Sequence, residues 1–225
     1  MLQYILLDID NTLLSFDEYV KRAMRDGFRK FGLPAYTPQM YAVFARHNAL
    51  LWGAIERGEM TLPELEQVRW NRIFADLGIR FDGVLFEEYF RAALFDSAIL
   101  IDGAIELLQS LHGKYTLCAA SNGPLDQQIH RLTLAGMLPY FEAVFASEEI
   151  GFSKPAPEFF GECLRRLHAC PQEAMIVGDS LSSDIRGGIR AGLHTCYYNP
   201  DDKPVPEDLP VEYNVRTLRE IAALL

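Results

Sequence analysis

The sequence predicts an α/β fold in which a mainly parallel, doubly wound sheet is interrupted by a helical insertion after its first strand. The first observation is that short apolar runs alternate with amphipathic helical patterns from about residue 98 to the end of the chain. The second is that residues 16–97 contain helical patterns but no convincing strand. Alternation of strands and helices is typical of a parallel sheet covered on both faces by helices.

The predicted sheet is built from short β-branched or aromatic runs. These strands are expected at residues 4–9, 114–120, 143–147, 174–178 and 195–199. Helices are predicted between them, because apolar residues recur there at intervals of three and four: 101–113, 124–137, 156–169 and 182–193. These segments close with Gly, His or Ala-Gly, which are common helix ends.

The insertion at residues 16–97 predicts four helices, at 17–32, 38–58, 61–78 and 82–95. Thr61 followed by Glu64, with Pro63 in the first turn, has the pattern of a capping box. The segment is long for a crossover and carries enough apolar residues for a small core of its own. We therefore expect a four-helix cap at 16–97, inserted in a core of 1–15 and 98–225; the alternative is that these helices cover one face of the sheet.

Composition excludes several classes of partner. The formal charge of −10, from 31 acidic and 21 basic residues, provides no basic field for a nucleic-acid polymer. No apolar stretch approaches the roughly 20 residues of a membrane span, and no basic and apolar leader stands at the start. We expect a cytoplasmic protein without membrane contact, either a monomer or a homodimer.

Acidic residues follow two of the predicted strands. Asp8 and Asp10 come at the end of the first strand, where residues two apart point to the same side. Asp179 follows the fourth strand and Asp184 comes about one helical turn later. Buried carboxylates are costly unless they are paired or hold a cation, and oxygen ligands suit Mg²⁺. If the two strands are neighbours, these acids form a magnesium site at the carboxyl edge of the sheet.

Groups suited to phosphate follow the other strands. Ser121, Asn122 and Gly123 precede Pro124, so a hydroxyl and free backbone amides lie at a predicted helix start. Lys154 stands directly before another such start. A hydroxyl, a lysine and clustered acids at successive strand ends together indicate a site for a phosphorylated small molecule.

Four segments carry a resemblance to a known family. They are DIDNT (8–12), SNG (121–123), KP (154–155) and GDSLSSD (178–184). In this order they resemble the four motifs of the haloacid dehalogenase superfamily. The resemblance implies a Rossmann-like core and a magnesium-dependent phosphatase that works through an aspartyl phosphate.

The resemblance also implies a role for each acid. Asp8 would be the nucleophile and would contact the metal. Asp10 would protonate the leaving alkoxide and then activate water, while its backbone carbonyl binds Mg²⁺. Asp179 would bind the metal directly, and Asp184 would complete the site or orient metal-bound water.

The phosphate would be held by the two remaining motifs. Ser121 would donate a hydrogen bond to a phosphoryl oxygen, with Asn122 and Gly123 beside it. Lys154 would balance the charge of the nucleophile and the phosphate.

Other reactions of the superfamily fit less well. Its dehalogenases generally lack the second acid, so Asp10 argues against a dehalogenase. Phosphonate hydrolases need a Schiff-base lysine in the cap, where only Lys21 and Lys30 occur, both in an ordinary amphipathic helix. A phosphosugar mutase would keep all four motifs and stays open. A non-catalytic binding protein would be expected to have lost one of the motif residues.

Within the phosphatases, the chain resembles the bacterial pyrimidine 5′-nucleotidase branch. The segments that carry this resemblance are LLWGAIERGEMTLPEL, SEEIGFSKPAPEFF and GGIRAGLHTCYYN. It implies a nucleoside 5′-monophosphate as substrate, with a phosphoglycolate or sugar-phosphate phosphatase as the alternative. Phe16, directly after the loop of the first motif, and Trp52 are the aromatic side chains expected to contact a base, although aromatics at helical spacing more often belong to a core.

Overall fold

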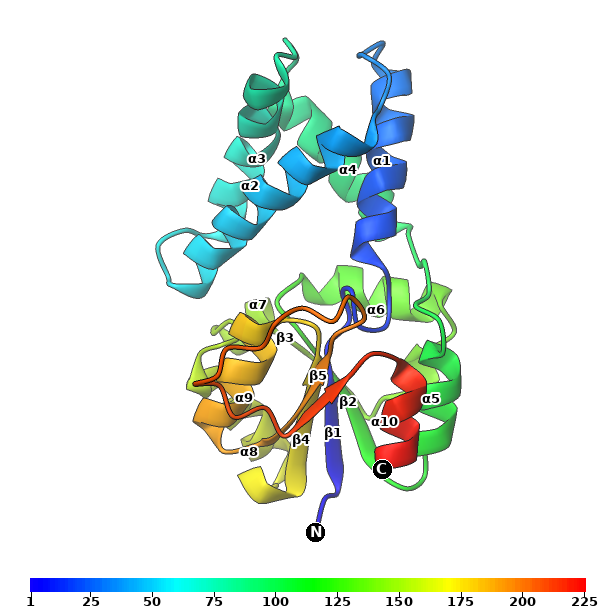
Figure 1. Ribbon diagram of the computed structural model, residues 1–225, viewed down its shortest axis with the longest axis vertical. Coiled ribbons are helices and arrows are strands. Elements are labelled where there is room, and N and C mark those ends of the chain that lie inside the picture. Colours follow the sequence, from blue (N-terminus) through cyan, green and yellow to red (C-terminus); the bar gives the residue numbers. More distant parts are fainter. The chain divides into compact units, whose positions relative to one another are not determined.

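The computed structural model describes residues 1–225 and divides them into two compact units, Met1–Ser15 with Ala98–Leu225 and Phe16–Ser97. The first unit contains a six-stranded sheet in the order β3-β2-β1-β4-β5-β6, with every pair of neighbours parallel (Figure 1). The strands are β1 (Tyr4–Leu7), β2 (Thr116–Ser121), β3 (Ala143–Ala146), β4 (Ala174–Gly178), β5 (His194–Tyr198) and β6 (Tyr213–Val215). Chain order runs outward from β1 in both directions, which confirms the predicted doubly wound α/β fold.

Helices connect the strands of this unit. They are α5 (Ala104–Leu111), α6 (Leu125–Leu134), α7 (Ser147–Ile150), α8 (Pro157–Leu167), α9 (Arg186–Ala191) and α10 (Leu218–Leu224). Short turns of other helix types lie at Leu138–Tyr140, Pro171–Glu173 and Leu181–Ile185, the last of them a π-helical turn.

The sheet is buried on both faces because side chains alternate along each strand. Ile5 and Leu7 belong to one core cluster, shared with side chains of α5, α6 and α10. Leu6 belongs to the other, which α8 covers. Figure 1 shows α5 and α10 together on one side of the strands and α8 and α9 on the other.

Glycine permits the close packing of α9 on the sheet. A Cβ atom at Gly188 would lie 2.3 Å from the Ile176 side chain of β4 and 3.1 Å from that of Thr195 in β5. Only a residue without a side chain fits at this distance, so the glycine pair of GGIRAGL serves packing.

The first strand ends earlier than its sequence predicts. β1 stops at Leu7, and the backbone then turns so that the amides of Leu13 and Leu14 both donate to the carbonyl of Ile9. Asn11 adopts φ 63° in this turn, a left-handed conformation that asparagine tolerates better than most residues. Asp8 and Asp10 therefore follow the strand, and the turn rather than the strand pleat decides where their carboxylates point.

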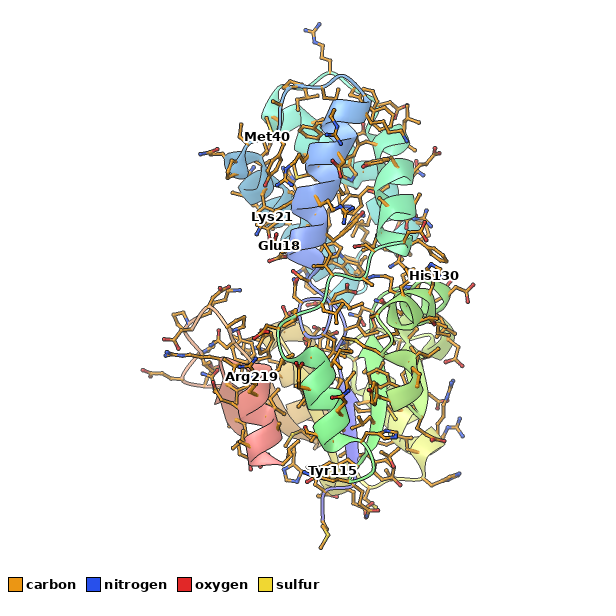
Figure 2. The ribbon with its side chains drawn as sticks, turned by 90° about the vertical axis from the view of Figure 1, so that its right-hand side faces the viewer. Glu18, Lys21, Met40, Tyr115, His130 and Arg219 are labelled. Atoms are coloured by element: carbon orange, nitrogen blue, oxygen red, sulfur yellow. The ribbon has the colours of Figure 1, made fainter.

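The second unit consists of α1 (Phe16–Lys30), α2 (Pro38–Glu56), α3 (Leu62–Leu77) and α4 (Gly83–Phe95). The capping box at the start of α3 is present, since the Thr61 amide donates to Glu64 at 2.8 Å and the Glu64 amide donates to the Thr61 hydroxyl. On the surface of α1, Glu18 and Lys21 lie side by side and form an ion pair at 2.6 Å (Figure 2).

The core of the helical unit is aromatic. Its buried rings come from α1, α2, α3 and α4: Tyr19, Phe28, Phe44, Trp70, Phe74, Phe86 and Phe90. Neighbouring rings pack in tilted or edge-to-face arrangements, which favour aromatic pairs. No helix of either unit is long and apolar enough to cross a membrane.

Candidate active site

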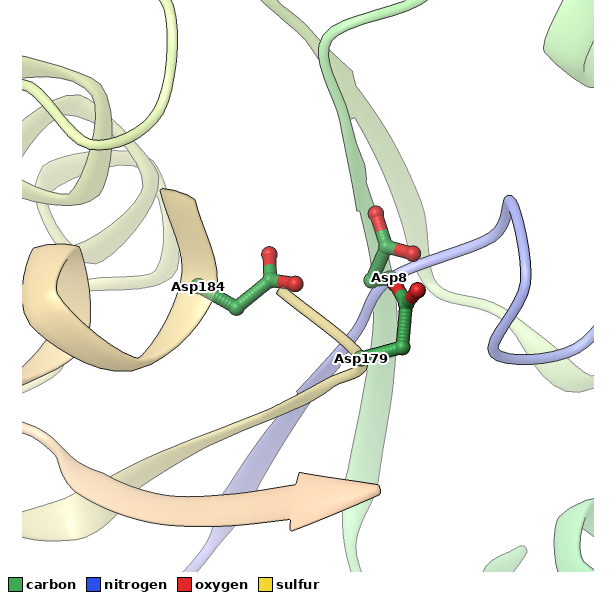
Figure 3. Close-up of side chains that lie close together, drawn as sticks. All are labelled: Asp8, Asp179 and Asp184. Carbon is green, nitrogen blue, oxygen red and sulfur yellow. The ribbon is translucent and has the colours of Figure 1, made fainter. Parts of the chain in front are cut away.

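Three carboxylates meet at the carboxyl edge of the sheet. Asp8 follows β1, Asp179 follows β4 and Asp184 lies in the π-helical turn after it (Figure 3). Each offers a carboxylate oxygen, and these atoms all lie within 4.8 Å of one another. The parallel pairing of β1 with β4 brings the three acids together, although more than 170 residues separate Asp8 from the other two in the chain.

Lys154 supplies positive charge to this cluster. Its ammonium group donates to Asp8 Oδ1 at 2.7 Å, to Asp184 Oδ1 at 2.6 Å and to the carbonyl of Ala120 at 2.7 Å. These three bonds use all three donors of the ammonium group, and the side chain is only 2% exposed. Burial works to lower the pKa of Lys154, but the Asp184 and Asp8 carboxylates outweigh burial and raise it. Lys154 is therefore charged at neutral pH.

Asp8 carries a perturbed carboxyl group. Burial raises its pKa to about 7, against the attraction of Lys154, and the negative charge of Asp184 adds to the rise. Its second oxygen accepts a hydrogen bond from the Thr12 hydroxyl at 3.0 Å. The surroundings thus fix both oxygens of Asp8.

Asp184 is held by its neighbours on both oxygens. Oδ1 accepts from Lys154, and Oδ2 accepts from the backbone amide of Ser180 at 3.1 Å. A Cβ atom at Gly178 would lie 2.2 Å from Asp184 Oδ2, so the glycine at the end of β4 leaves the room that this carboxylate occupies.

Gly178→Ala is expected to displace Asp184 and to lower both stability and activity. Overpacking of this kind costs about 1–3 kcal/mol, and a displaced Asp184 also breaks the bond to Lys154. Thermal unfolding and turnover measure the two effects. Gly161→Ala in α8 is the matched control, because a Cβ there meets no atom within 4 Å; equal behaviour of the two variants would contradict the packing argument.

The predicted phosphate-binding segment joins β2 to Lys154. The Asn122 side chain donates to the Lys154 carbonyl at 2.9 Å and accepts from the Lys154 amide at 2.8 Å. The Ser121 hydroxyl oxygen accepts from the Gly123 amide at 3.0 Å. Asn122 thus fixes the backbone of the lysine, while Ser121 and Gly123 lie at the end of the strand.

Asp10 is not one of the three grouped carboxylates, although its negative charge adds to the rise in the pKa of Asp8. Its two oxygens accept hydrogen bonds from α6, Oδ1 from Arg131 Nη1 and Oδ2 from Gln128 Nε2, both at 2.7 Å. Sequence reasoning missed Arg131, Gln128 and also Thr12. In the sequence, a glutamine and an arginine three residues apart on an amphipathic helix look like part of a solvated face. Only the structure shows that both side chains are buried.

The two cap residues expected to contact a base are only half buried. The ring of Phe16 packs near Tyr19, Phe44 and Phe90, with centroids 5.8 to 6.3 Å apart, at the margin of the aromatic core. Trp52 lies on α2 and is also half buried.

The donor set suits a hard divalent cation. Asp8, Asp179 and Asp184 provide oxygen ligands only, and Mg²⁺ is typically bound through one or two carboxylates together with water and substrate phosphate. With Lys154 as the only cation bonded to Asp8 and Asp184, a further positive charge would relieve the repulsion among the three acids.

Comparison with known proteins identifies the class to which this fold and site belong. A family model described as haloacid dehalogenase-like hydrolase matches residues 2–192. The chain belongs to the haloacid dehalogenase-like hydrolases, so the expected membership is confirmed.

Particular relatives extend over almost the whole chain. The HAD-family protein YfnB of Bacillus subtilis is 38% identical over 223 residues, which cover 98% of this chain and 94% of YfnB. A crystal structure of YfnB bound to magnesium, in which interdomain movement was described, matches with a TM-score of 0.92 and 36% identity, covering 100% of this chain and 98% of that one. The pyrimidine 5′-nucleotidase PynA of Streptococcus pneumoniae is 33% identical and covers 88% of this chain and 84% of PynA. The pyrimidine 5′-nucleotidase YjjG of Escherichia coli is 29% identical, and the match covers 99% of this chain and 97% of YjjG.

Proposed function

We propose that this hydrolase is a magnesium-dependent phosphomonoester phosphatase that acts through an aspartyl phosphate on Asp8. The observation that carries the proposal is the placement of Asp8, whose carboxylate bonds to the Lys154 ammonium at 2.7 Å and belongs to a cluster of three acids whose oxygens could hold a metal ion. Phosphoryl transfer needs positioning and positive charge around the phosphoryl oxygens. Lys154 provides one such charge, and Mg²⁺ held by Asp8, Asp179 and Asp184 would supply the other.

The proposed reaction has two steps. An oxygen of Asp8 attacks phosphorus, the bond to the ester oxygen breaks, and Asp10 gives the departing alkoxide a proton. Asp10 then takes a proton from water, the water oxygen attacks phosphorus, and Asp8 leaves with inorganic phosphate released. In both steps the hydroxyl of Ser121 donates to a phosphoryl oxygen, and the positive charge of Lys154 attracts the phosphoryl group.

The second acid separates this proposal from a dehalogenation. A halide leaves without a proton, whereas an alkoxide is a poor leaving group unless it is protonated. Asp10 is bound by two donors from α6, which suits a group that must keep its place near a leaving oxygen.

We propose further that the substrate is a pyrimidine nucleoside 5′-monophosphate. PynA and YjjG are both named as pyrimidine 5′-nucleotidases and extend over most of this chain. The half-buried rings of Phe16 and Trp52 offer apolar surface that could stack on a base.

Phosphate release from a substrate panel tests both levels of the proposal. The panel contains pyrimidine and purine nucleoside monophosphates, sugar phosphates and phosphoglycolate, each measured with Mg²⁺ and with a chelator. We expect turnover that requires Mg²⁺ and favours uridine and thymidine 5′-monophosphates. Turnover confined to sugar phosphates or phosphoglycolate would overturn the nucleotidase assignment, and a phosphosugar rearranged without phosphate release would indicate a mutase.

Magnesium binding is expected to release protons in a way that depends on pH. Asp8 has its pKa raised to about 7, so the metal-free site holds a proton below that pH that the metal must displace. We expect release of about half a proton per Mg²⁺ at pH 7, nearly one at pH 5.5 and almost none at pH 9. The apparent affinity should therefore fall as the pH is lowered below 7.

Calorimetry in buffers of different ionisation enthalpy measures this proton release. Asp8→Asn is the control, because it has no proton to release at this position. Equal release by the wild type and the variant would show that the proton does not come from Asp8.

A further inference from the structure

The amide of Gln128 joins two groups of the proposed reaction. Gln128 Nε2 donates to Asp10 Oδ2 at 2.7 Å and to the Ser121 hydroxyl oxygen at 2.8 Å. Its Oε1 accepts from Arg131 Nη1 at 3.0 Å, and the same nitrogen donates to Asp10 Oδ1 at 2.7 Å. Gln128 and Arg131 are three residues apart on α6 and face the same direction.

The contact with Arg131 fixes which way the amide points. A guanidinium group can only donate, so the atom of Gln128 that faces Arg131 is the carbonyl oxygen. The NH₂ group must then face Asp10 and Ser121. Both donors of that group are used, and Gln128 is completely buried, so no water competes for them.

This orientation determines what the Ser121 hydroxyl can do. Its oxygen accepts one hydrogen bond from Gln128 Nε2 and another from the Gly123 amide at 3.0 Å. A hydroxyl oxygen has two lone pairs, and both are used. The O–H bond therefore points in the remaining direction, where it can donate to a phosphoryl oxygen.

The glycine of the SNG segment has a place in the same arrangement. A Cβ atom at Gly123 would lie 2.5 Å from Gln128 Nε2. Any larger residue would push the amide away from Asp10 and Ser121. Glycine at position 123 thus leaves room for the Gln128 amide beside Asp10 and Ser121.

We propose that Gln128 and Arg131 are positioning residues that hold the Asp10 carboxylate for proton transfer and direct the Ser121 hydroxyl toward phosphate. This inference rests on the proposed function. Its alternative is that the two residues only anchor α6 to the turn after β1, which would make their loss a matter of stability alone.

The dependence of rate on the leaving group separates the two roles. Asp10 must protonate a strongly basic alkoxide, but p-nitrophenolate leaves with little help from an acid. For Gln128→Leu we expect kcat/KM to fall about a hundredfold with an alkyl phosphate such as uridine 5′-monophosphate or glycerol 1-phosphate. With p-nitrophenyl phosphate the fall should be at least about tenfold smaller. Arg131→Lys keeps a cation, so its kcat/KM with the alkyl phosphate should lie between that of Gln128→Leu and that of the wild type.

Gln127→Leu is the matched control, since it makes the same substitution at the next position of α6, outside the network. It should behave as the wild type does with both esters. If Gln128→Leu lost the same factor of kcat/KM with both esters, the proposal would be overturned in favour of simple anchoring. The same conclusion would follow if Arg131→Met kept the wild-type ratio of kcat/KM for the alkyl phosphate to kcat/KM for p-nitrophenyl phosphate.

Crystal structures of the wild type and Gln128→Leu decide the matter independently of turnover. The proposal requires that the Asp10 carboxylate or the Ser121 hydroxyl be displaced in the variant while α6 keeps its place. Unchanged positions of both groups would overturn it. A wild type that hydrolyses neither ester would instead overturn the proposed function, and the two structures would still decide whether Gln128 positions these groups.

Discussion

Asp8→Asn is expected to lower phosphate release by about four orders of magnitude or more, because an amide cannot take up the phosphoryl group. The variant should stay folded. Asparagine matches the shape of aspartate and can still accept from Lys154, and the burial that raises the pKa of Asp8 already favours a neutral group there. Turnover with the best substrate of the panel measures the loss.

Trapping experiments identify the intermediate directly. Wild-type protein quenched in acid during turnover of a radiolabelled phosphomonoester should retain label that is released by alkali, as an acyl phosphate is. Asp8→Asn should retain none, and Asp26→Asn, a partly exposed position on α1, should retain as much as the wild type. Activity of Asp8→Asn above about one per cent of wild type would exclude Asp8 as the nucleophile.

Lys154→Met is expected to destabilise the metal-free protein by about 3–5 kcal/mol, as loss of one partner in a buried ion pair does. The substitution leaves Asp8 and Asp184 buried without the ammonium group that now bonds to both. It also removes the charge proposed to hold the phosphate, so turnover should fall along with stability. Denaturant unfolding with and without Mg²⁺ measures the change, and Mg²⁺ should restore part of the loss.

The pH dependence of the Lys154→Met defect follows from the same charges. Without the lysine, nothing opposes the burial that raises the pKa of Asp8 in the folded state above its value in the unfolded state. The folded state then binds more protons, and its stability falls as the pH rises. The difference from wild type should therefore shrink between pH 8 and pH 5. A defect that is the same at both pH values would show that lost packing, rather than uncompensated charge, is responsible.

The fold was predictable because it depends on local patterns. Apolar runs of strand length and amphipathic helices alternate along the sequence, and such an order has few solutions other than a doubly wound sheet. The carboxyl ends of parallel strands meet at one edge, so the order of the motifs also indicated that Asp8, Asp179 and Lys154 would lie close together. Asp8 and Asp179 directly follow their strands, and Lys154 comes eight residues after the end of β3.

The sequence patterns do not encode the geometry that a turn or a distant contact decides. The sequence predicted that Asp8 and Asp10 point to the same side of the first strand. In the structure β1 ends at Leu7, both acids follow it, and Asp10 accepts hydrogen bonds from α6. The contact between Asp10 and Arg131 joins residues 121 positions apart. No periodicity along the chain encodes such a distance.

By itself, the sequence determined the order of strands and helices, the family and the residues that carry the proposed chemistry, because periodicity and short motifs are properties of neighbouring residues. Only the tertiary structure decided which groups hold those residues in place. Gln128 and Arg131 hold Asp10 in place because α6 lies beside the turn after β1. Gly178 leaves room for Asp184 because it has no side chain. Such contacts depend on how separate elements fit against one another, and that fit exists only in the folded protein.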